Sequence, residues 1–426
     1  MVYEESRVFQ TKRLFGYGIA CPCPNTAGTG PNNRSCARMA RTMRKNLALT
    51  LSGSALAKFR KRLLAWFVLH RRDLPWRRTR NPYHIWLSEI MLQQTRAAAV
   101  IPYYQRFLQR FPDVQTLAEA PEQEVLRLWA GLGYYSRARN LQKAAGQILA
   151  KHGGEFPQAR EEALALAGIG SYTAAAILSI AYGEKLAVLD GNVARVLARL
   201  GAIRGNLREA GRWRNLQMAA DALLDSATPG DWNQAMMELG ATVCTPRAPR
   251  CLLCPVGGFC EGRKLGLAES LPEKRKKRAP VQVRLAAAVL LDAKGRTLLL
   301  PPPLSATNGD GAANHLPSLL SKMWHFPTVS VNGSAESALR RYLRLLGASA
   351  EVQSADFLPL KDVRHAITYR DVRVTPFRVS LKQLPHIEAG KVLPLEGLDA
   401  VPVSNLTRKV ARAALPQTPN EKRRNS

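Results

Sequence analysis

The sequence predicts a mainly α-helical domain, residues 51–265, followed by a smaller α+β domain, residues 281–412. Two observations support this division. Apolar residues recur with helical spacing from Ala55 up to a cysteine-rich segment, whereas short β-rich runs such as VRLAAAVLLDA and VRVTPFRVSL, with one helix at ESALRRYLRLLG, dominate after residue 281. Between the two patterns lies SLPEKRKKRAP, a basic segment bounded by prolines, and we interpret residues 266–280 as a linker.

The composition favours a polyanionic partner. Of the 426 residues, 62 are Lys or Arg and 32 are Asp or Glu, which gives a formal net charge of +30. Because arginines recur throughout the chain, nucleic acid is the leading candidate, and a merely basic protein is the alternative. No apolar run approaches the roughly 20 residues that cross a membrane, and no secretory signal is convincing, so we expect an intracellular protein without membrane contact.

Both ends of the chain lack a core-forming pattern. Residues 1–50 contain Pro, Gly, Asn and Arg, few acids and no periodic apolar face, and residues 413–426 end in NEKRRNS. We expect both segments to be disordered, the first as a basic extension. The early cysteines, Cys21, Cys23 and Cys36, have no specific role in this interpretation.

A basic loop follows the first predicted helix, which runs from Ala55 to His70. The loop reads RRDLPWRRTRNP and places Trp76 among arginines, including Arg72 and Arg77. An aromatic ring among cations suits contact with bases and phosphates, although a solvated connection is the plain alternative.

The next predicted helix, YHIWLSEIMLQQTRAAAV, holds a single acid in a strongly apolar run. At helical spacing Glu89 shares a stripe with Ile85, Leu92 and Arg96. Apolar neighbours would partly desolvate this carboxyl group and raise its pKa. The alternative is a solvent-facing glutamate.

The stretch from Leu164 to Asn192, LALAGIGSYTAAAILSIAYGEKLAVLDGN, joins a glycine turn to an isolated carboxylate. Gly168 and Gly170 allow a turn with positive φ, whose amides would point outward at a helix start and bind phosphate. Asp190 stands just before a second helix. The plain alternatives are an ordinary turn and an ordinary N-cap.

Four late cysteines have the spacing Cys244-x6-Cys251-x2-Cys254-x5-Cys260, within seventeen residues. Cysteine-only ligation suits an iron-sulfur cluster or zinc. Zinc sites more often pair two short Cys-x2-Cys units, and one is present here, so the spacing modestly favours iron-sulfur. Two cations, Arg247 and Arg250, lie between the first two cysteines.

The motifs together resemble a known family. AGIGSYTA with LDGNV resembles the helix-hairpin-helix DNA glycosylases of the endonuclease III and MutY superfamily, and WLSEIMLQQT and GLGYYSRARN resemble the MutY-type adenine DNA glycosylases. The resemblance spans roughly Ala55 to Val410. It implies that the four late cysteines hold a [4Fe-4S] cluster.

The resemblance also implies roles for the isolated acids. Glu89 would be the general acid that protonates adenine, and Asp190 would stabilise the positively charged sugar left behind. Tyr172 would help hold that sugar, and Asn192 would orient the site. The two acids need opposite protonation states, which burial of Glu89 and hairpin amides near Asp190 could provide.

Further residues are implied to meet the DNA and the flipped base. Gln94, beside Gln93, would enter the base stack, and Tyr134 would lie against the base opposite the target, although core packing is the ordinary explanation for Tyr134 and Tyr135. Phosphate contacts fall to Gly168, Gly170, Arg137, Arg139, Arg247 and Arg250, and the base pocket to Trp76, Arg77 and Leu92.

The C-terminal domain, with MWHFP, resembles the MutT-like domain of the same family. We see no carboxylate-rich Nudix box, so we expect this Nudix-like domain to be non-hydrolytic. Many family members place a Phe-Ser-His loop against 8-oxoguanine, and its counterpart here is Ile367, Thr368 and Tyr369. Thr368 and Tyr369 would then contact the lesion, and a surface hairpin without that contact is the alternative.

The resemblance implies a monofunctional enzyme that hydrolyses the N-glycosidic bond of adenine opposite 8-oxoguanine or guanine in double-stranded DNA. Tyr172 stands where the lyase branch has a lysine, and a phenol cannot form an imine. The alternatives are an endonuclease III-like pyrimidine glycosylase with lyase activity and a non-catalytic iron-sulfur DNA-binding protein. We expect a cytoplasmic, nucleoid-associated monomer.

Overall fold

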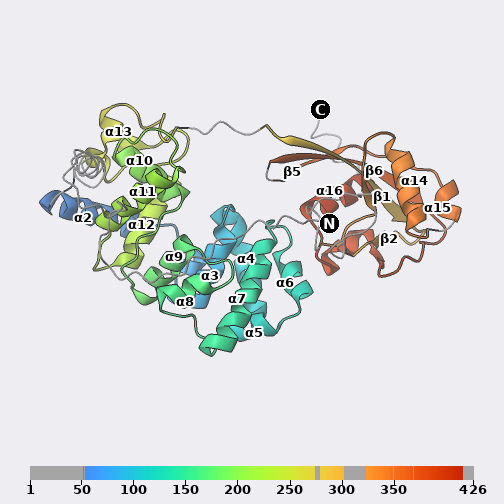
Figure 1. Ribbon diagram of the computed structural model, residues 1–426, viewed down its shortest axis with the longest axis horizontal. Helices are drawn as coiled ribbons and strands as arrows, with labels where there is room; N and C mark the ends of the chain where they lie inside the picture. Colours follow the sequence, from blue (N-terminus) through green and yellow to red (C-terminus); the bar gives the residue numbers. More distant parts are fainter. Residues whose placement is uncertain are drawn as a thin grey trace, which may run out of the picture.

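The computed structural model describes residues 51, 53–273, 279–301, 323–348, 350–367 and 369–415. Two lobes are visible, one helical and one built on a β-sheet (Figure 1). The expectations for the first fifty residues, for Thr368 and for the last eleven residues concern parts of the chain outside this description. Within the described ranges, no helix combines the length and the apolar character needed to cross a membrane.

The helical lobe confirms the predicted succession of helices. The helix predicted at residues 55–70 begins two residues earlier, at Gly53. The elements are α2 Gly53–His70, η1 Pro75–Arg77, α3 Pro82–Leu92, α4 Ala97–Arg110, α5 Val114–Glu119, α6 Glu122–Trp129, α7 Ser136–His152, α8 Arg160–Ala165, α9 Ser171–Tyr182, α10 Gly191–Leu200, α11 Ala210–Leu223, α12 Pro229–Thr242, η2 Cys251–Leu253, η3 Gly257–Phe259 and α13 Glu261–Lys264.

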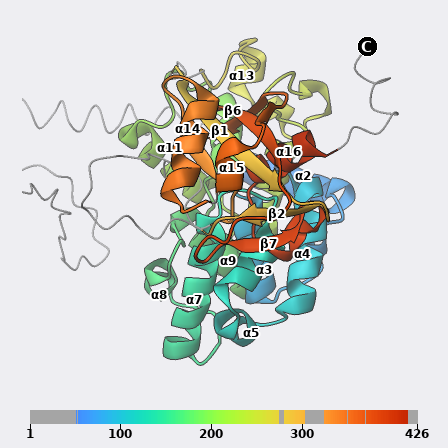
Figure 2. The same cartoon turned by 90° about the vertical axis from the view of Figure 1, so that its right-hand side faces the viewer.

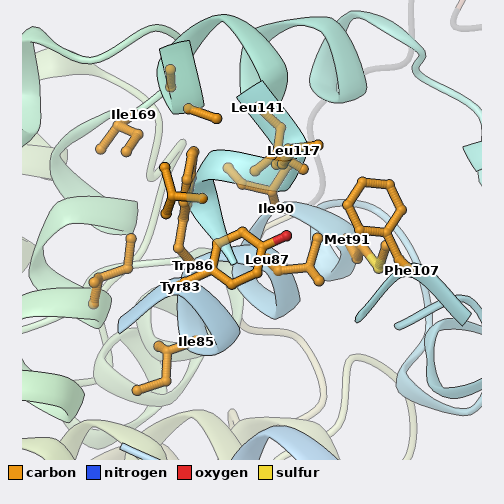
Figure 3. Packing of buried hydrophobic residues seen from close by; sticks show 14 of the residues in the cluster. Tyr83, Ile85, Trp86, Leu87, Ile90, Met91, Phe107, Leu117, Leu141 and Ile169 are labelled. Carbon is orange, nitrogen blue, oxygen red and sulfur yellow. The ribbon is translucent and has the colours of Figure 1, made fainter. Parts of the chain in front are cut away.

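Helix α3 is buried on nearly every face. Asn81 caps its N-terminus by accepting from the amides of residues 83 and 84, and Pro82 occupies the first turn, where no amide donor is missed. Eight of its eleven residues are buried. Trp86, Leu87 and Met91 pack into one core with side chains of α4 and α7 (Figure 3). A helix that is apolar all round requires neighbours on all sides.

Helix α9 lies between two cores. Ala174 packs with the α3 core, whereas Ala175 and Ala176 pack with a second core around Phe59 and Trp232. Alanine side chains are small, so helices on both sides can approach α9 closely. The cleft described below opens beside this helix.

The C-terminal lobe confirms the predicted α+β class. Its sheet has the order β4-β6-β1-β2-β7, with β3 paired to β1 and β5 to β6. The long strands β1 and β6 run parallel and in register from Val281↔Arg370 to Leu291↔Ser380. The elements are β1 Val281–Leu291, β2 Arg296–Leu299, β3 Thr328–Ser330, α14 Ala335–Leu345, α15 Ala350–Ser354, β4 Leu358–Pro359, β5 Val363–Ile367, β6 Arg370–Ser380, β7 Lys391–Pro394, η4 Leu395–Ala400 and α16 Asn405–Ala414.

Side chains of β1 alternate between two cores, one on each face of the sheet. Leu285, Ala287 and Val289 pack with α16, whereas Ala286 and Ala288 pack with α14. Helix α16 lies toward the helical lobe, and α14 and α15 lie on the far side (Figures 1 and 2). Because α16 continues to Ala414, the predicted start of the tail at residue 413 is two residues too early.

The lobes meet at the turn before α7. The Tyr135 hydroxyl lies 3.4 Å from the Val403 carbonyl oxygen, and the Asn405 side chain donates to the Gly131 carbonyl at 3.1 Å. The same tyrosine oxygen accepts from the Gly131 amide at 3.4 Å. The sheet lobe therefore contacts the segment that carries Tyr134.

Two helical glycines give a matched test of how closely α12 packs. A Cβ on Gly240 would lie 2.8 Å from the Asn192 Cβ and 3.2 Å from its carbonyl carbon, whereas a Cβ on Gly146 in α7 would meet nothing within 4 Å. We expect Gly146→Ala to raise the free energy of unfolding by about 0.5–1 kcal/mol, because alanine is the better helix former.

Gly240→Ala gains the same helix propensity, but it must displace the backbone at Asn192. We expect a net loss of about 1–3 kcal/mol, the usual cost of overpacking. Urea unfolding followed by tryptophan fluorescence measures both variants. Equal stabilisation of the two would show that α10 and α12 are not in tight contact.

Candidate active site

A cleft of about 1030 Å³ opens between α3, α9, α12 and the start of α10. Glu89, Tyr172 and Asp190, which are far apart in the sequence, all line it. The predicted base-pocket residues Trp76, Arg77 and Leu92 line it as well. The fold thus brings together the residues that the sequence assigned separately to chemistry and to the base.

Glu89 is buried, as its position in an apolar helix predicted. It retains 6% of its exposure and accepts a hydrogen bond from the Tyr172 hydroxyl at 2.7 Å. Burial raises the pKa of Glu89 to about 7, against the opposing effect of the Tyr172 hydrogen bond. The nearby charge of Asp190 raises this pKa further, and that of Arg77 lowers it. Glu89 can therefore hold or release a proton near neutral pH.

Asp190 is the N-cap of α10, so the plain interpretation of this residue is correct, and it also faces the cleft. One carboxylate oxygen accepts from the amides of Asn192 and Val193 at 2.9 and 2.7 Å, and the other accepts from the Asn192 side chain at 3.0 Å. Burial raises the pKa of Asp190 above its ordinary value, and these hydrogen bonds oppose the rise. Arg195 fixes Asn192 in turn by donating to its side-chain oxygen at 2.8 Å.

A second buried acid, Glu238 on α12, was missed from the sequence. Its carboxylate accepts from Arg72 at 2.7 and 2.8 Å and from Arg77 at 2.8 Å. Burial alone would raise the pKa of Glu238, but the hydrogen bonds from both arginines lower it to about 2. The signal was the same as for Glu89, a single acid in the apolar run NQAMMELGATVC. Met237 beside it contacts the Tyr172 hydroxyl through sulfur at 3.2 Å.

The glycine turn partly matches its prediction. Gly168 has φ +76°, and a Cβ there would lie 2.7 Å from the Asn140 Cβ, so the position requires glycine. Gly170 has φ −99° and precedes α9 as its N-cap, so the positive φ of this turn is at Gly168 alone of the two glycines. Gly170 is exposed, with nothing within 4 Å of its missing side chain, which leaves its backbone accessible at a helix N-terminus.

Gln94 and Tyr134 both adopt left-handed backbone conformations, with φ of 58° and 48°. Both are exposed, so core packing does not account for Tyr134, whereas Tyr135 packs against the α3 core.

The expectation that Arg137 reaches phosphate is wrong. Its guanidinium is buried and donates to backbone carbonyls on both sides, so these donors are engaged within the protein. Arg139 is half-buried and has a buried Nη1 without a hydrogen-bond partner among the described residues.

The four late cysteines are half-buried and lie close enough to influence one another's ionisation. In the described ranges, no three His, Cys, Asp or Glu side chains converge tightly enough to hold one metal ion. Arg199, itself buried, donates to the Cys244 sulfur at 3.2 Å, a contact typical of a thiolate ligand. The residues therefore fit a cysteine-ligated cluster.

Three predicted DNA contacts lie on the surface. Arg247 and Arg250, in the loop between the first two of these cysteines, are exposed. In the sheet lobe, Tyr369 is exposed, and the Arg370 guanidinium lies 4.9 Å from its ring centre. Thr368 lies outside the described residues, and Ile367 beside it is half-buried at the end of β5.

Comparison with known proteins places this geometry in a family. Residues 87–217 match the model of the HhH-GPD superfamily base excision DNA repair proteins, a range that includes Glu89, the glycine turn and Asp190. Adenine DNA glycosylase of Rattus norvegicus is 34% identical over 410 residues, covering 83% of this chain and 77% of the rat protein.

Other relatives match over shorter ranges. Adenine DNA glycosylase of Homo sapiens is 49% identical over 215 residues, covering 48% of this chain and 39% of the human protein. The Arabidopsis thaliana adenine DNA glycosylase is 38% identical over 324 residues, covering 67% of this chain and 49% of the plant protein. The chain thus spans less than half the length of these two relatives and about three quarters of the rat protein. Through the long match to the rat protein and the superfamily match around the cleft, the chain belongs to the adenine DNA glycosylase family.

Proposed function

We propose that this protein releases adenine from double-stranded DNA by hydrolysing the N-glycosidic bond where adenine lies opposite 8-oxoguanine or guanine. One observation carries the proposal. A buried carboxylic acid with a pKa of about 7, Glu89, faces the same cleft as a hydrogen-bonded carboxylate, Asp190. A protein that only binds DNA has no need of such a pair, whereas paired carboxyl groups in opposite states serve glycosidic bond cleavage.

Glu89 would supply the proton. An adenine inside a duplex must be flipped out before its ring nitrogens can be reached, and the cleft is large enough to take it. Adenine leaves poorly as an anion, so protonation of a ring nitrogen, which the family resemblance places at N7, lowers the barrier. Tyr172 holds the carboxyl group in place through its hydrogen bond at 2.7 Å.

Asp190 would stabilise the sugar cation that forms as adenine departs. Hydrogen bonds from Asn192 and Val193 favour its charged form and fix its direction. Burial acts on both acids, and at Asp190 these hydrogen bonds oppose its effect.

Other residues that line the cleft with Glu89 would hold the base. Glu238 anchors Arg72 and Arg77 by paired hydrogen bonds, which fixes cationic donors beside the apolar side chains of Trp76 and Leu92. Such a mixture of flat apolar surface and fixed polar groups suits a purine.

Monofunctional chemistry is supported by the residue at position 172. Burial raises the pKa of Tyr172 well above its ordinary value, so the phenol stays neutral and donates to Glu89. No lysine is found among the cleft-lining residues in the part of the chain that the structure describes. A lyase needs an amine to form an imine with the sugar, so the pyrimidine glycosylase and lyase alternative is disfavoured.

Recognition of the opposite base would fall to exposed aromatic and amide groups. Gln94 lines the cleft and Tyr134 lies in the turn before α7, and both have a left-handed backbone conformation. A side chain inserted into the base stack can fill the gap left by a flipped base. Tyr369 on the sheet lobe offers a phenol that can stack or donate a hydrogen bond. The net charge of +30 favours binding of the duplex itself.

The decisive experiment measures single-turnover adenine release from duplexes with adenine opposite 8-oxoguanine or guanine. We expect Glu89→Gln and Asp190→Asn each to reduce the rate by roughly 10²–10⁴-fold or more, because each removes a proton or charge at little change in volume. Duplex affinity, measured by fluorescence anisotropy, should remain close to that of the wild type.

Two controls complete this test. A duplex with a damaged pyrimidine should release no base, and borohydride should trap no covalent complex with either substrate. A near-wild-type rate in Glu89→Gln or Asp190→Asn would contradict the assigned roles, and efficient trapping would contradict monofunctional chemistry.

The rate of adenine release should depend on pH in a bell-shaped manner. Glu89 must be protonated to act, so the rate should fall as the pH rises through about 7. Asp190 must be ionised, so the rate should also fall in acid, below a pKa that burial raises above its ordinary value. Single-turnover rates from pH 5 to 9, with duplex affinity measured at each pH as the control, check this. If the fall in rate at alkaline pH persisted unchanged in Glu89→Gln, that fall would have to be assigned to another group.

We further propose that Cys244, Cys251, Cys254 and Cys260 hold a [4Fe-4S] cluster. Burial raises the pKa of the Cys254 thiol to about 11, so without metal this thiol stays protonated. The cluster would supply folding energy to the loop, which presents the exposed cations Arg247 and Arg250.

Anaerobically purified protein should therefore be brown, with iron and sulfide in similar amounts. Cys251→Ser should lose the absorbance and loosen the loop to proteolysis, whereas Glu261→Gln, a change at an exposed ion pair nearby, should keep both. Stoichiometric zinc without iron would overturn the assignment.

A further inference from the structure

We propose that Arg137 is a positioning residue that holds Gln94 and Tyr134 in a fixed relation to each other and to the helix that carries Glu89. This inference rests on the proposed function, since it assigns to Gln94 and Tyr134 a joint role in opening the duplex. Arg137 itself touches neither DNA nor the base.

One guanidinium group joins two segments that are distant in the sequence. Its Nη1 donates to the carbonyls of Ile90, Met91 and Gln93 at 2.7, 2.9 and 2.7 Å. Its Nη2 donates to the carbonyls of Leu132 and Gly133 at 3.3 and 3.2 Å. The first set lies at the end of α3, and the second lies in the turn before α7.

The contacts fall next to the two strained residues. Gln93 immediately precedes Gln94, and Gly133 immediately precedes Tyr134. Non-glycine residues with φ near +50° are unfavourable and persist only where their surroundings hold them. Arg137 supplies a hydrogen bond to the neighbour of each one. Arg137 therefore fixes the direction in which the side chains of Gln94 and Tyr134 project from the surface.

The buried charge of Arg137 is stabilised by hydrogen bonds to backbone carbonyls and not by an ion pair with an acid. The residue retains 9% of its exposure, and no acidic side chain among the described residues forms an ion pair with it. Ile90, Met91 and Gln93 belong to the C-terminal turn of α3, where carbonyls lack helical partners and the helix dipole is negative. The rings of Trp129 and Tyr134 lie 5.3 and 5.6 Å from the guanidinium carbon. The hydrogen bonds that stabilise the buried cation therefore also join the two segments.

Lysine cannot replace this geometry. A guanidinium presents its donors in a planar fork, so it can donate to the end of α3 and to the turn before α7 at the same time. An ammonium group carries its three donors on a single atom. Arg137→Lys keeps the charge but loses the hydrogen bonds to one of the two segments, either the end of α3 or the turn before α7. Freed from that anchor, either Gln94 or Tyr134 would lose its fixed position, and the pair would no longer enter the duplex as a unit.

The test separates opening of the duplex from chemistry on the base. Single-turnover release is measured for adenine opposite guanine in a duplex and for adenine opposite an abasic site, where the base is already unpaired. We expect Arg137→Lys to lose about tenfold or more on the mispaired duplex, equivalent to roughly 1.4 kcal/mol. Most of that loss should disappear on the unpaired adenine. Arg127→Lys, the same change at an exposed arginine on α6, is the matched control and should behave as the wild type.

Fluorescence of a 2-aminopurine beside the target adenine reports unstacking without any base release. Arg137→Lys should show a smaller rise on binding than the wild type and Arg127→Lys. If the wild type released no adenine from either substrate, the proposed function would fail, and this signal alone would decide the inference.

Several outcomes would overturn the inference. An equal loss on both adenine substrates would indicate general damage to the fold, and an unchanged rate with unchanged fluorescence would show that Arg137 positions nothing. Arg137→Gln, which keeps a donor for one segment only, is the second variant. If circular dichroism showed both variants to be unfolded, the role would be structural and the inference wrong.

Discussion

Desolvation of one carboxyl group, that of Glu89, is the constraint on which the cleft depends. The group is buried because α3 is apolar on nearly every face. Side chains of α4, α7 and α9 pack around this helix. The alanines of α9 allow that enclosure, and Tyr172 on the same helix supplies the neutral partner that a buried acid requires. Packing and chemistry therefore have a common origin in this pair of helices.

Two buried glutamates in this cleft show that hydrogen-bond partners decide whether a buried carboxyl group has a raised or a lowered pKa. Glu89 meets a phenol and has a pKa of about 7, whereas Glu238 meets two guanidinium groups and has a pKa of about 2. Both are largely removed from water. Arg77 acts on both acids, because it donates to Glu238 and its charge lowers the pKa of Glu89. A change at Glu238 would therefore alter the pKa of Glu89 through Arg77, without direct contact between the two acids.

The sequence predicted those features that depend on local pattern. Apolar periodicity indicated α2, α3 and α14, and a lone acid in an apolar helix indicated the burial of Glu89. The same signal at Glu238 could not be interpreted, because its partner Arg72 lies 166 positions away along the chain. Arg137 was misassigned for a similar reason, since only the fold brings the end of α3 to its side chain. The roles of Asp190 and Tyr172 came from family resemblance, because spacing alone equally suits an N-cap and a core tyrosine.

The contact between the lobes has a consequence for how the protein can engage a long polymer. Among the described residues it includes two neutral hydrogen bonds, at Gly131 and at Tyr135, of 3.1 and 3.4 Å. Bonds of this kind are worth about 0.5–1.5 kcal/mol each, so breaking these two costs less than unfolding either lobe. If the lobes parted at these bonds, a continuous double helix could enter between them from the side, with no need for a free end. The bond at Tyr135 lies one residue from Tyr134, so the lobes meet beside the side chain that we propose meets the opposite base.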